Sequence, residues 1–199
     1  MAIQSRSAEK ERLAPHDWED AALAVIASRG VGAVSVEALA RQLGVTKGSF
    51  YWHFVDRAAL LASALERWQA RYTQSVIDAL EAVTDPRQRL EKLIIGTDGS
   101  SEAWRVHVAL STSAHEPAVA VALARVSKQR IAYVEACYRA LGFSKDAARS
   151  RAVLAYSAYL GFLHLKLEGP SEVPQGKKRR PYLTSVLEVL LPASNARVT

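Results

Sequence analysis

The chain has 199 residues, of which 49% are hydrophobic and 23% are charged, a composition that supports a packed core and argues against global disorder. No apolar run reaches the ~18–20 residues of a membrane span, and the N-terminus lacks the apolar stretch of a signal peptide. A single cysteine, Cys137, excludes an intrachain disulfide and a cysteine-built zinc site. We therefore expect a cytoplasmic protein with no cofactor and no membrane partner.

The net charge of +6 favours a nucleic-acid partner, but its distribution does not locate the binding end. Residues 1–58 carry seven basic and seven acidic side chains, so the whole excess lies in residues 59–199. A local motif therefore has to identify any DNA-binding element.

The first part of the chain predicts a polar arm followed by a helix. Residues 1–13 are polar and of mixed charge, and we expect a flexible arm. An alternative is that its basic residues (Arg6, Lys10 and Arg12) enter a minor groove. From Trp18 onward the apolar residues follow helical spacing, and Gly30 ends this helix because glycine accepts the left-handed cap conformation.

Two short helices with a tight turn are expected next. Ser35 is a good N-cap for a helix that stops at Gly44, and Thr46 can cap a third helix that runs to about His53. Only Gly44 and Val45 separate the two helices. This arrangement is the anatomy of a helix-turn-helix.

The rest of the chain predicts six more helices and no strands. Proline, aspartate, serine and glycine signals place them at about 57–83, from 86 to the break at 97–101, 102–114, 117–142, 145–169 and from 181 onward. The segment 169–180, with the basic run Lys177–Arg180, reads as a solvated loop, although such a run can also touch DNA or a membrane.

The predicted fold is therefore all-α, with about nine helices in two parts. After the arm (1–13), residues 14–58 form an N-terminal three-helix helix-turn-helix domain. Residues 59–199 form a larger helical domain for effector binding and dimerisation.

The third helix should present one face to DNA. Phe50 and Phe54, four residues apart, fall on the inner face, whereas Gly48, Tyr51 and Trp52 fall on the opposite one. A two-turn helix that shows large aromatic side chains to water needs a partner, and the major groove fits it. The alternative is that the two outer aromatic residues belong to the core.

The candidate DNA contacts are Ser35, Thr46, Lys47, Gly48, Ser49, Tyr51, Trp52, His53 and Arg57. Lys47 and Trp52 are the candidates for base edges, and the absent side chain of Gly48 allows close backbone approach. The polar residues and Arg57 are candidates for phosphates. Two of these residues also have plainer interpretations, since Ser35 is a helix cap and His53 lies at a helix end.

The stretch AALAVIASRGVGAVSVEALARQLGVTKGSFYWHFVDRAALL resembles the N-terminal domain of the TetR family of transcriptional regulators. The matching positions are Gly30, Ser35, Ala40, Leu43, Gly44, Val45, Thr46, Tyr51, His53 and Phe54. The family's usual lysine at the start of the fourth helix is Arg57 here. The resemblance covers about 45 residues. It implies a homodimer that binds a palindromic operator on double-stranded DNA and is released when a small molecule enters the C-terminal domain.

The eighth and ninth helices are the expected dimer interface. The eighth is apolar almost all round, with Ala152, Tyr156 and Leu163 on one side and Leu154 and Leu165 elsewhere, so it should be buried on more than one face. Burial within a monomer core is the alternative.

An effector pocket is expected among the fourth to eighth helices. Its candidate lining residues are aromatic or polar groups on otherwise apolar helices: Trp68, Tyr72, Trp104, His107, Ser111, Tyr133, Tyr156 and Tyr159. Each of them can also be plain core. A mainly apolar pocket with few polar groups suits a flat or aromatic ligand.

Enzymatic chemistry finds little support in this sequence. His107 and His115 lie eight residues apart, too far along a helix to share a metal ion, and Ser111 lacks a nucleophile turn. The principal hypothesis is a ligand-responsive repressor. The rivals are an activator or architectural DNA-binding protein with the same N-terminal domain, a small helical enzyme, and a helical adaptor.

Overall fold

The computed structural model describes residues 13–96, 102–169 and 171–191, and within these ranges the chain is helical without strands. The all-α prediction is confirmed. The elements in chain order are α1 (Pro15–Arg29), η1 (Val31–Ala33), α2 (Val36–Gln42), α3 (Lys47–Tyr51), α4 (Arg57–Gln69), η2 (Ala70–Gln74), α5 (Ser75–Glu81), α6 (Pro86–Gly96), α7 (Glu102–Thr112), α8 (Pro117–Ala140), α9 (Lys145–Glu168), η3 (Gly176–Lys178) and α10 (Arg179–Leu190). Counted as one continuous helix, α4, η2 and α5 bring the described helices to the nine that were expected.

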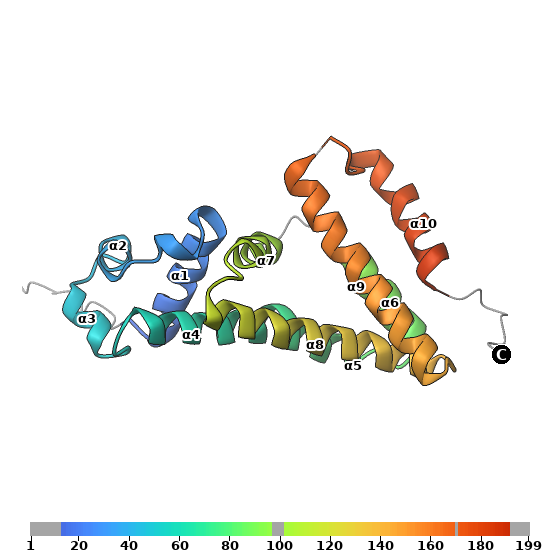
Figure 1. Cartoon of the computed structure of the whole chain (residues 1–199), viewed down its shortest axis with the longest axis horizontal. Coiled ribbons are helices and arrows are strands. Elements are labelled where there is room, and N and C mark those ends of the chain that lie inside the picture. The colour runs from blue at the N-terminus through green and yellow to red at the C-terminus, as the bar shows by residue number, and fades with distance from the viewer. Residues whose placement is uncertain (1–12, 97–101, 170, 192–199) are drawn as a thin grey trace, which may run out of the picture.

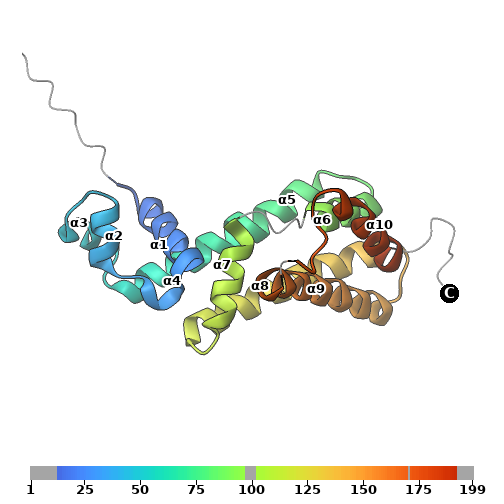
Figure 2. The same ribbon diagram turned by 90° about the horizontal axis from the view of Figure 1, so that it is seen from above.

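We call residues 14–58, which contain α1 to α3, the head, and the described residues from 59 onward the body; Figure 1 shows the head at the left end of the molecule. The α4 helix and η2 lie beside α8 along the long axis, α9 rises from the far end of α8, and α10 then runs back down. Figure 2 shows α7 crossing this pair between the head and the rest of the body. The predicted arm at residues 1–13 falls almost wholly outside the described residues.

Caps and positive-φ glycines set the ends of the head helices. Asp17 accepts a hydrogen bond from the Ala14 N–H at 2.7 Å at the start of α1, and Gly30 ends this helix with φ +83°. Ser35 Oγ accepts from the Ala38 N–H at 3.2 Å and so caps α2 as predicted. Gly44 takes φ +69° in the turn that follows.

The third helix departs from the expectation in two details. Thr46 stands at the N-cap position of α3, but its hydroxyl makes no capping hydrogen bond. The helix itself ends at Tyr51, and the chain continues through a hydrogen-bonded turn in which the His53 N–H donates to the Phe50 carbonyl at 2.9 Å. The helical geometry is therefore kept as far as the predicted end, although the last residues form a turn.

The last helix begins earlier than predicted. The sequence placed a loop through Arg180 and a helix start at Pro181, whereas η3 covers Gly176–Lys178 and α10 starts at Arg179. Proline stands at the third position of α10, where its missing N–H costs no helical hydrogen bond. All four residues of the basic run therefore lie in helical segments and not in a loop.

Two hydrophobic clusters hold the molecule together. The first contains Trp18, Phe50 and Trp68 and extends into α7 and α8 through Val106 and Val126. The second lies at the far end of the body, around Tyr138 and Phe143. The first cluster contains residues from both the head and the body, so the head packs directly on the body. None of the helices in the described ranges has the length and apolarity needed to cross a membrane.

Candidate DNA interface and ligand pocket

One face of α3 anchors the helix, and the other is open. The rings of Phe50 and Trp18 meet edge to face with their centroids 5.3 Å apart, and Phe50 and Phe54 are buried. Tyr51 is 56% exposed and Trp52, just after the helix, is 82% exposed. The structure therefore places these two aromatic side chains on the surface and not in the core.

The polar candidates surround this aromatic pair. Thr46, Lys47 and Gly48 are exposed, and Ser35, Ser49 and His53 are half-buried. The Lys47 ammonium forms an ion pair with Glu37 of α2, which raises the pKa of Lys47 and lowers that of Glu37. Both side chains are exposed, so the pair is weak, and DNA phosphates can replace the carboxylate at little cost.

Arg57 has a structural contact that sequence reasoning missed. Its Nε donates to the Val34 carbonyl at 2.8 Å, and its Nη2 donates to the Val31 carbonyl at 2.7 Å. These bonds tie the turn between α1 and α2 to the first residue of α4. A guanidinium has five N–H donors, so these two bonds leave others for a phosphate.

An ion pair also joins α1 of the head to α4. Arg67 donates through Nε and Nη2 to the two carboxylate oxygens of Asp20, at 2.6 and 2.7 Å. This bidentate contact lowers the pKa of Asp20. Ser63 donates to Glu19 at 2.5 Å one turn earlier on α4. The orientation of α1 is thus fixed on the helix that leads into the body.

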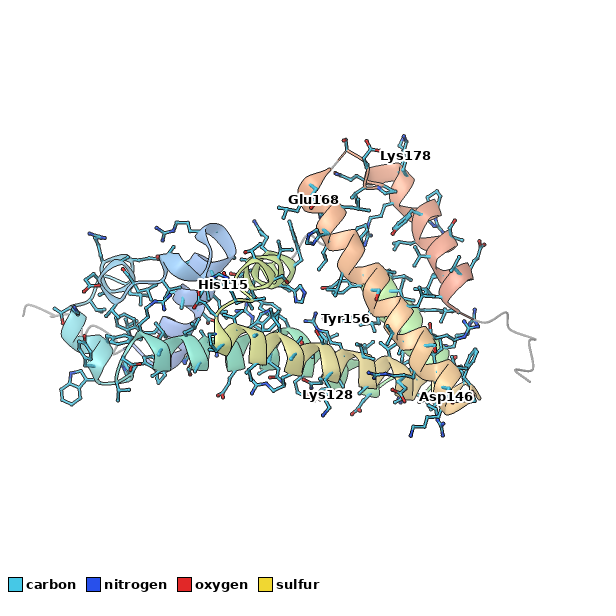
Figure 3. All side chains as sticks on the ribbon, viewed as in Figure 1. His115, Lys128, Asp146, Tyr156, Glu168 and Lys178 are labelled. Carbon is cyan, nitrogen blue, oxygen red and sulfur yellow. The ribbon has the colours of Figure 1, made fainter. Side chains whose placement is uncertain are left out.

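A cavity of about 530 Å³ lies in the body, lined by residues of η2, α5, α6, α8, α9 and α10 and of the start of α7. Five of the predicted residues line it: Tyr72, Trp104, Tyr133, Tyr156 and Tyr159. Figure 3 shows Tyr156 on α9 in the angle that this helix makes with α8, where its hydroxyl lies 3.1 Å from Ser127 Oγ. Burial raises the pKa of Tyr133 to about 12 and also raises that of Tyr159.

Three predicted lining residues lie elsewhere. Trp68 and His107 are buried, with ring centroids 5.9 Å apart, and Ser111 donates to the His107 carbonyl at 2.9 Å. None of the three lines the cavity: Trp68 belongs to the first hydrophobic cluster, His107 packs against Trp68, and Ser111 is exposed. Burial lowers the pKa of His107 to about 4, so the imidazole is neutral at pH 7.

The most informative lining residue, Arg130 of α8, was not predicted. Its Nε donates to Thr73 Oγ1 at 3.0 Å, and its Nη2 donates to the Tyr72 carbonyl at 3.1 Å. Its guanidinium lies 6.0 Å from the ring centroids of both Trp68 and Tyr159. The signal available in the sequence is an arginine four residues from Val134 on an otherwise apolar helix face.

The described residues contain no group of three His, Cys, Asp or Glu side chains that could hold a metal ion.

The model of the bacterial regulatory proteins of the tetR family matches residues 20–64, which cover the helix-turn-helix and the start of α4. The uncharacterised HTH-type transcriptional regulator TtgW of Pseudomonas putida is 30% identical over 102 residues, which are 44% of this chain and 76% of TtgW. The chain belongs to the TetR family.

A second relative of this TetR-family protein is matched over a smaller share of its own length. The HTH-type transcriptional regulator SrpR of Pseudomonas putida is 30% identical over 102 residues, which are 44% of this chain and 48% of SrpR. The matched region thus spans about half the length of that relative.

Solved structures extend the likeness of the fold to the body. The reduced form of E. coli NemR has a TM-score of 0.71 at 20% identity, covering 90% of this chain and 99% of NemR. The multidrug binding protein EbrR in complex with malachite green has a TM-score of 0.65 at 19% identity, covering 90% of this chain and 98% of EbrR. At these identities the likeness shows the fold: an N-terminal helix-turn-helix followed by a helical domain.

Proposed function

We propose that this TetR-family protein is a ligand-responsive repressor that binds a palindromic operator as a homodimer and leaves it when a small molecule enters the body. The observation that carries the proposal is the connection between the two sites. One helix, α4–η2–α5, begins at Arg57 in the head and lines the cavity from Tyr72 to Leu80. A change at the cavity therefore has a continuous helical path to the DNA-binding face.

The head supplies the DNA contacts. The open face of α3 enters the major groove, where Lys47 and Trp52 contact base edges and Gly48 allows close backbone approach. The phosphate contacts come from Ser35, Thr46, Ser49, Tyr51 and His53. Arg57 adds the N–H groups that do not donate to the backbone carbonyls of the α1–α2 turn. Two copies of α3 must then reach half-sites about 34–36 Å apart, which requires a dimer.

The dimer forms through α9 and α10. One face of α9 is exposed in the single chain and is mostly small or apolar, with Val153, Leu154, Ser157, Gly161 and Leu165. An apolar face of this length on one chain is typical of a surface that a second copy covers. The two α9 helices and the two α10 helices would form a four-helix interface.

The effector acts on the π-helical segment η2. This segment interrupts the α4–η2–α5 helix at Ala70–Gln74, and such segments often mark positions where a helix can change its geometry. Arg130 holds η2 through Thr73 and the Tyr72 carbonyl from the opposite wall. A ligand that engages Arg130 changes this hold and shifts the population toward a head spacing that no longer fits the operator. EbrR, of the same fold, binds malachite green, which supports a pocket for a flat ligand.

The first test is a selection of bound duplexes from a random DNA pool with purified protein at a stated salt concentration. A palindrome with half-sites about one helical turn apart supports the dimeric repressor. Folded, dimeric protein that recovers nothing above non-specific background overturns the proposal. The selected operator, placed across a reporter promoter, then distinguishes repression from activation.

A further inference from the structure

The described residues that line the cavity carry charge of one sign only. Among the described lining residues three are charged, namely Lys92, Arg130 and Arg179, and none is Asp or Glu. The other lining residues are mainly aliphatic and aromatic. A cavity with apolar walls and cations alone attracts negative charge, because its low dielectric strengthens the interaction.

Arg130 is the cation best placed to hold a ligand. It is half-buried, and no described carboxylate lies within ion-pair distance of it. Its two hydrogen bonds go to neutral oxygens, those of the Thr73 hydroxyl and the Tyr72 carbonyl. Its positive charge is therefore uncompensated among the described residues, and a buried charge without a counter-ion is costly. An anionic ligand supplies that counter-ion.

The second arginine fixes a corner of the cavity. Arg179, at the start of α10, donates to the Ile95 carbonyl at 3.1 Å and so joins α10 to the end of α6. Lys92 of α6 is exposed. The two cations add positive charge from the α6 and α10 walls, while Arg130 lies on the α8 wall between Tyr72 and Tyr159.

The walls around these charges suit a flat apolar body. The rings of Phe162 and Tyr182 stack with their centroids 5.9 Å apart and their planes within 17°, and they join α9 to α10 across the cavity wall. The ring centroids of Tyr156 and Tyr159, which line the cavity from α9, lie 6.1 Å apart. Aromatic rings in this number pack well against a flat hydrophobic ligand.

We propose that the pocket takes an amphipathic anion, an apolar or aromatic body with one carboxylate, and that Arg130 binds the carboxylate. This inference rests on the proposed function, because it names the chemical class of the effector. A guanidinium binds a carboxylate through two parallel N–H donors, and such charge-assisted bonds are stronger than neutral ones. The same cations disfavour a positively charged dye of the malachite green type.

The test compares three probes with the same body and different charge: 1-pyrenebutyrate, 1-pyrenebutanol and 1-pyrenebutylammonium. The dissociation constant of each for the purified protein is measured from pyrene emission at a fixed salt concentration. We expect the carboxylate to bind at least about tenfold more tightly than the alcohol, and the ammonium to bind most weakly. Equal binding of the three, tighter binding of the ammonium, or no binding of the carboxylate overturns the proposal.

Two variants locate the anion site. Arg130→Gln should reduce the ratio of the two affinities, carboxylate over alcohol, to within about twofold of one. Arg125→Gln is the matched control, since Arg125 is exposed on the same helix and does not line the cavity. Circular dichroism and the melting temperature report folding. If Arg130→Gln fails to fold, the comparison of the three probes with the unaltered protein still decides the proposal.

Release of DNA is measured separately on the selected operator. Release by the alcohol and the carboxylate alike contradicts the ligand class and leaves the repressor proposal intact. Tight, charge-selective binding that releases no DNA supports the ligand class and contradicts ligand control of the operator.

Discussion

At the scale of single residues, His107 gives the molecule a defined response to pH. Its imidazole is buried against Trp68, and burial, assisted by the positive charge of Arg130, lowers its pKa to about 4 from 6.5. The unfolded chain therefore binds a proton between these values while the folded chain does not. Stability is full above pH 6.5 and falls as the pH drops to about 4, by about 3 kcal/mol from this group.

We expect His107→Leu to flatten the dependence of the free energy of unfolding on pH between 6.5 and 4. Urea denaturation at several pH values in this window measures it. His115→Leu is the control, because His115 is exposed and its removal should leave the slope unchanged. Parallel slopes in His107→Leu and the unaltered protein would show that the buried imidazole does not titrate in this way.

Trp52 exposes a large aromatic side chain to solvent, which is costly unless a partner such as the proposed operator covers it. Because it is 82% exposed, Trp52→Ala should change the free energy of unfolding by less than about 0.5 kcal/mol. On the selected operator the same change should cost about 1–3 kcal/mol of binding and relax specificity. Fluorescence anisotropy with operator and unrelated duplexes measures both. Val55→Ala, at an equally exposed neighbour, should leave binding unchanged, and an equal loss in both variants would contradict a specific contact.

Sequence reasoning succeeded for residues whose environment is local. The inner and outer faces of α3 follow from its helical repeat, so the burial of Phe50 and the exposure of Trp52 could be predicted. It failed where the partner is distant in the chain. The hydrogen bonds of Arg57 to Val31 and Val34 depend on how α4 crosses the α1–α2 turn, which no local pattern encodes.

At the scale of elements, the ion pair between Asp20 of α1 and Arg67 of α4 adds a polar contact to the hydrophobic packing of the head on the body. Asp20 and Arg67 are both partly exposed, so the bidentate contact between them is worth about 1 kcal/mol after solvent screening. The pKa of Asp20 is lowered in the folded state, mainly by the hydrogen bonds from Arg67. Its contribution to stability is therefore present above the carboxyl's ordinary value of 3.8 and is lost as the pH falls below it.

We expect Asp20→Asn to lower the free energy of unfolding at pH 7 by about 1 kcal/mol, and this deficit to shrink below pH 3.8. Chemical denaturation at both pH values measures it. Glu66→Gln is the matched control on α4, because Glu66 is exposed and faces no described cation within ion-pair distance. A deficit that stays constant with pH would mean that packing and not charge is lost.

The elements themselves were largely predictable, and the cavity between them was not. Proline, serine and glycine signals placed the ends of α8 and α9 within a few residues. The cavity depends on which face of each helix meets its neighbours. That is why α7 contributes Trp104 to the lining, while His107 on the same helix packs against Trp68 of the first cluster and Ser111 is exposed.

At the scale of the whole molecule, the head, the cavity and the outer face of α9 form one system. The α4–η2–α5 helix joins the first two, and α9 carries Tyr156 on its cavity side and Leu154 on its exposed side. A ligand in the cavity therefore touches both the helix that orients the head and the helix proposed to hold the partner. In the proposed dimer, control of the distance between the two heads would draw on both contacts.

The proposed dimer makes a further prediction for α9. Leu154 is 54% exposed and Leu165 is 53% exposed in the single chain, so changing both to Glu should spare the fold of the monomer. Buried opposite their own copies, four carboxylates would repel one another and lose the apolar contact. We expect the double variant to sediment as a monomer and to bind the operator at least about 100-fold more weakly, because two linked half-site contacts become one.

Val121→Glu provides the control for this experiment, since Val121 is an exposed valine of α8 outside the proposed interface. It should remain a dimer with unchanged operator affinity. Analytical ultracentrifugation measures the assembly state, and a single half-site duplex measures the intrinsic affinity of one head. The monomeric double variant should bind the half-site as well as the unaltered protein does, because its α3 face is intact. A double variant that stays dimeric would place the interface elsewhere, and a monomer with full operator affinity would show that pairing of heads is not required.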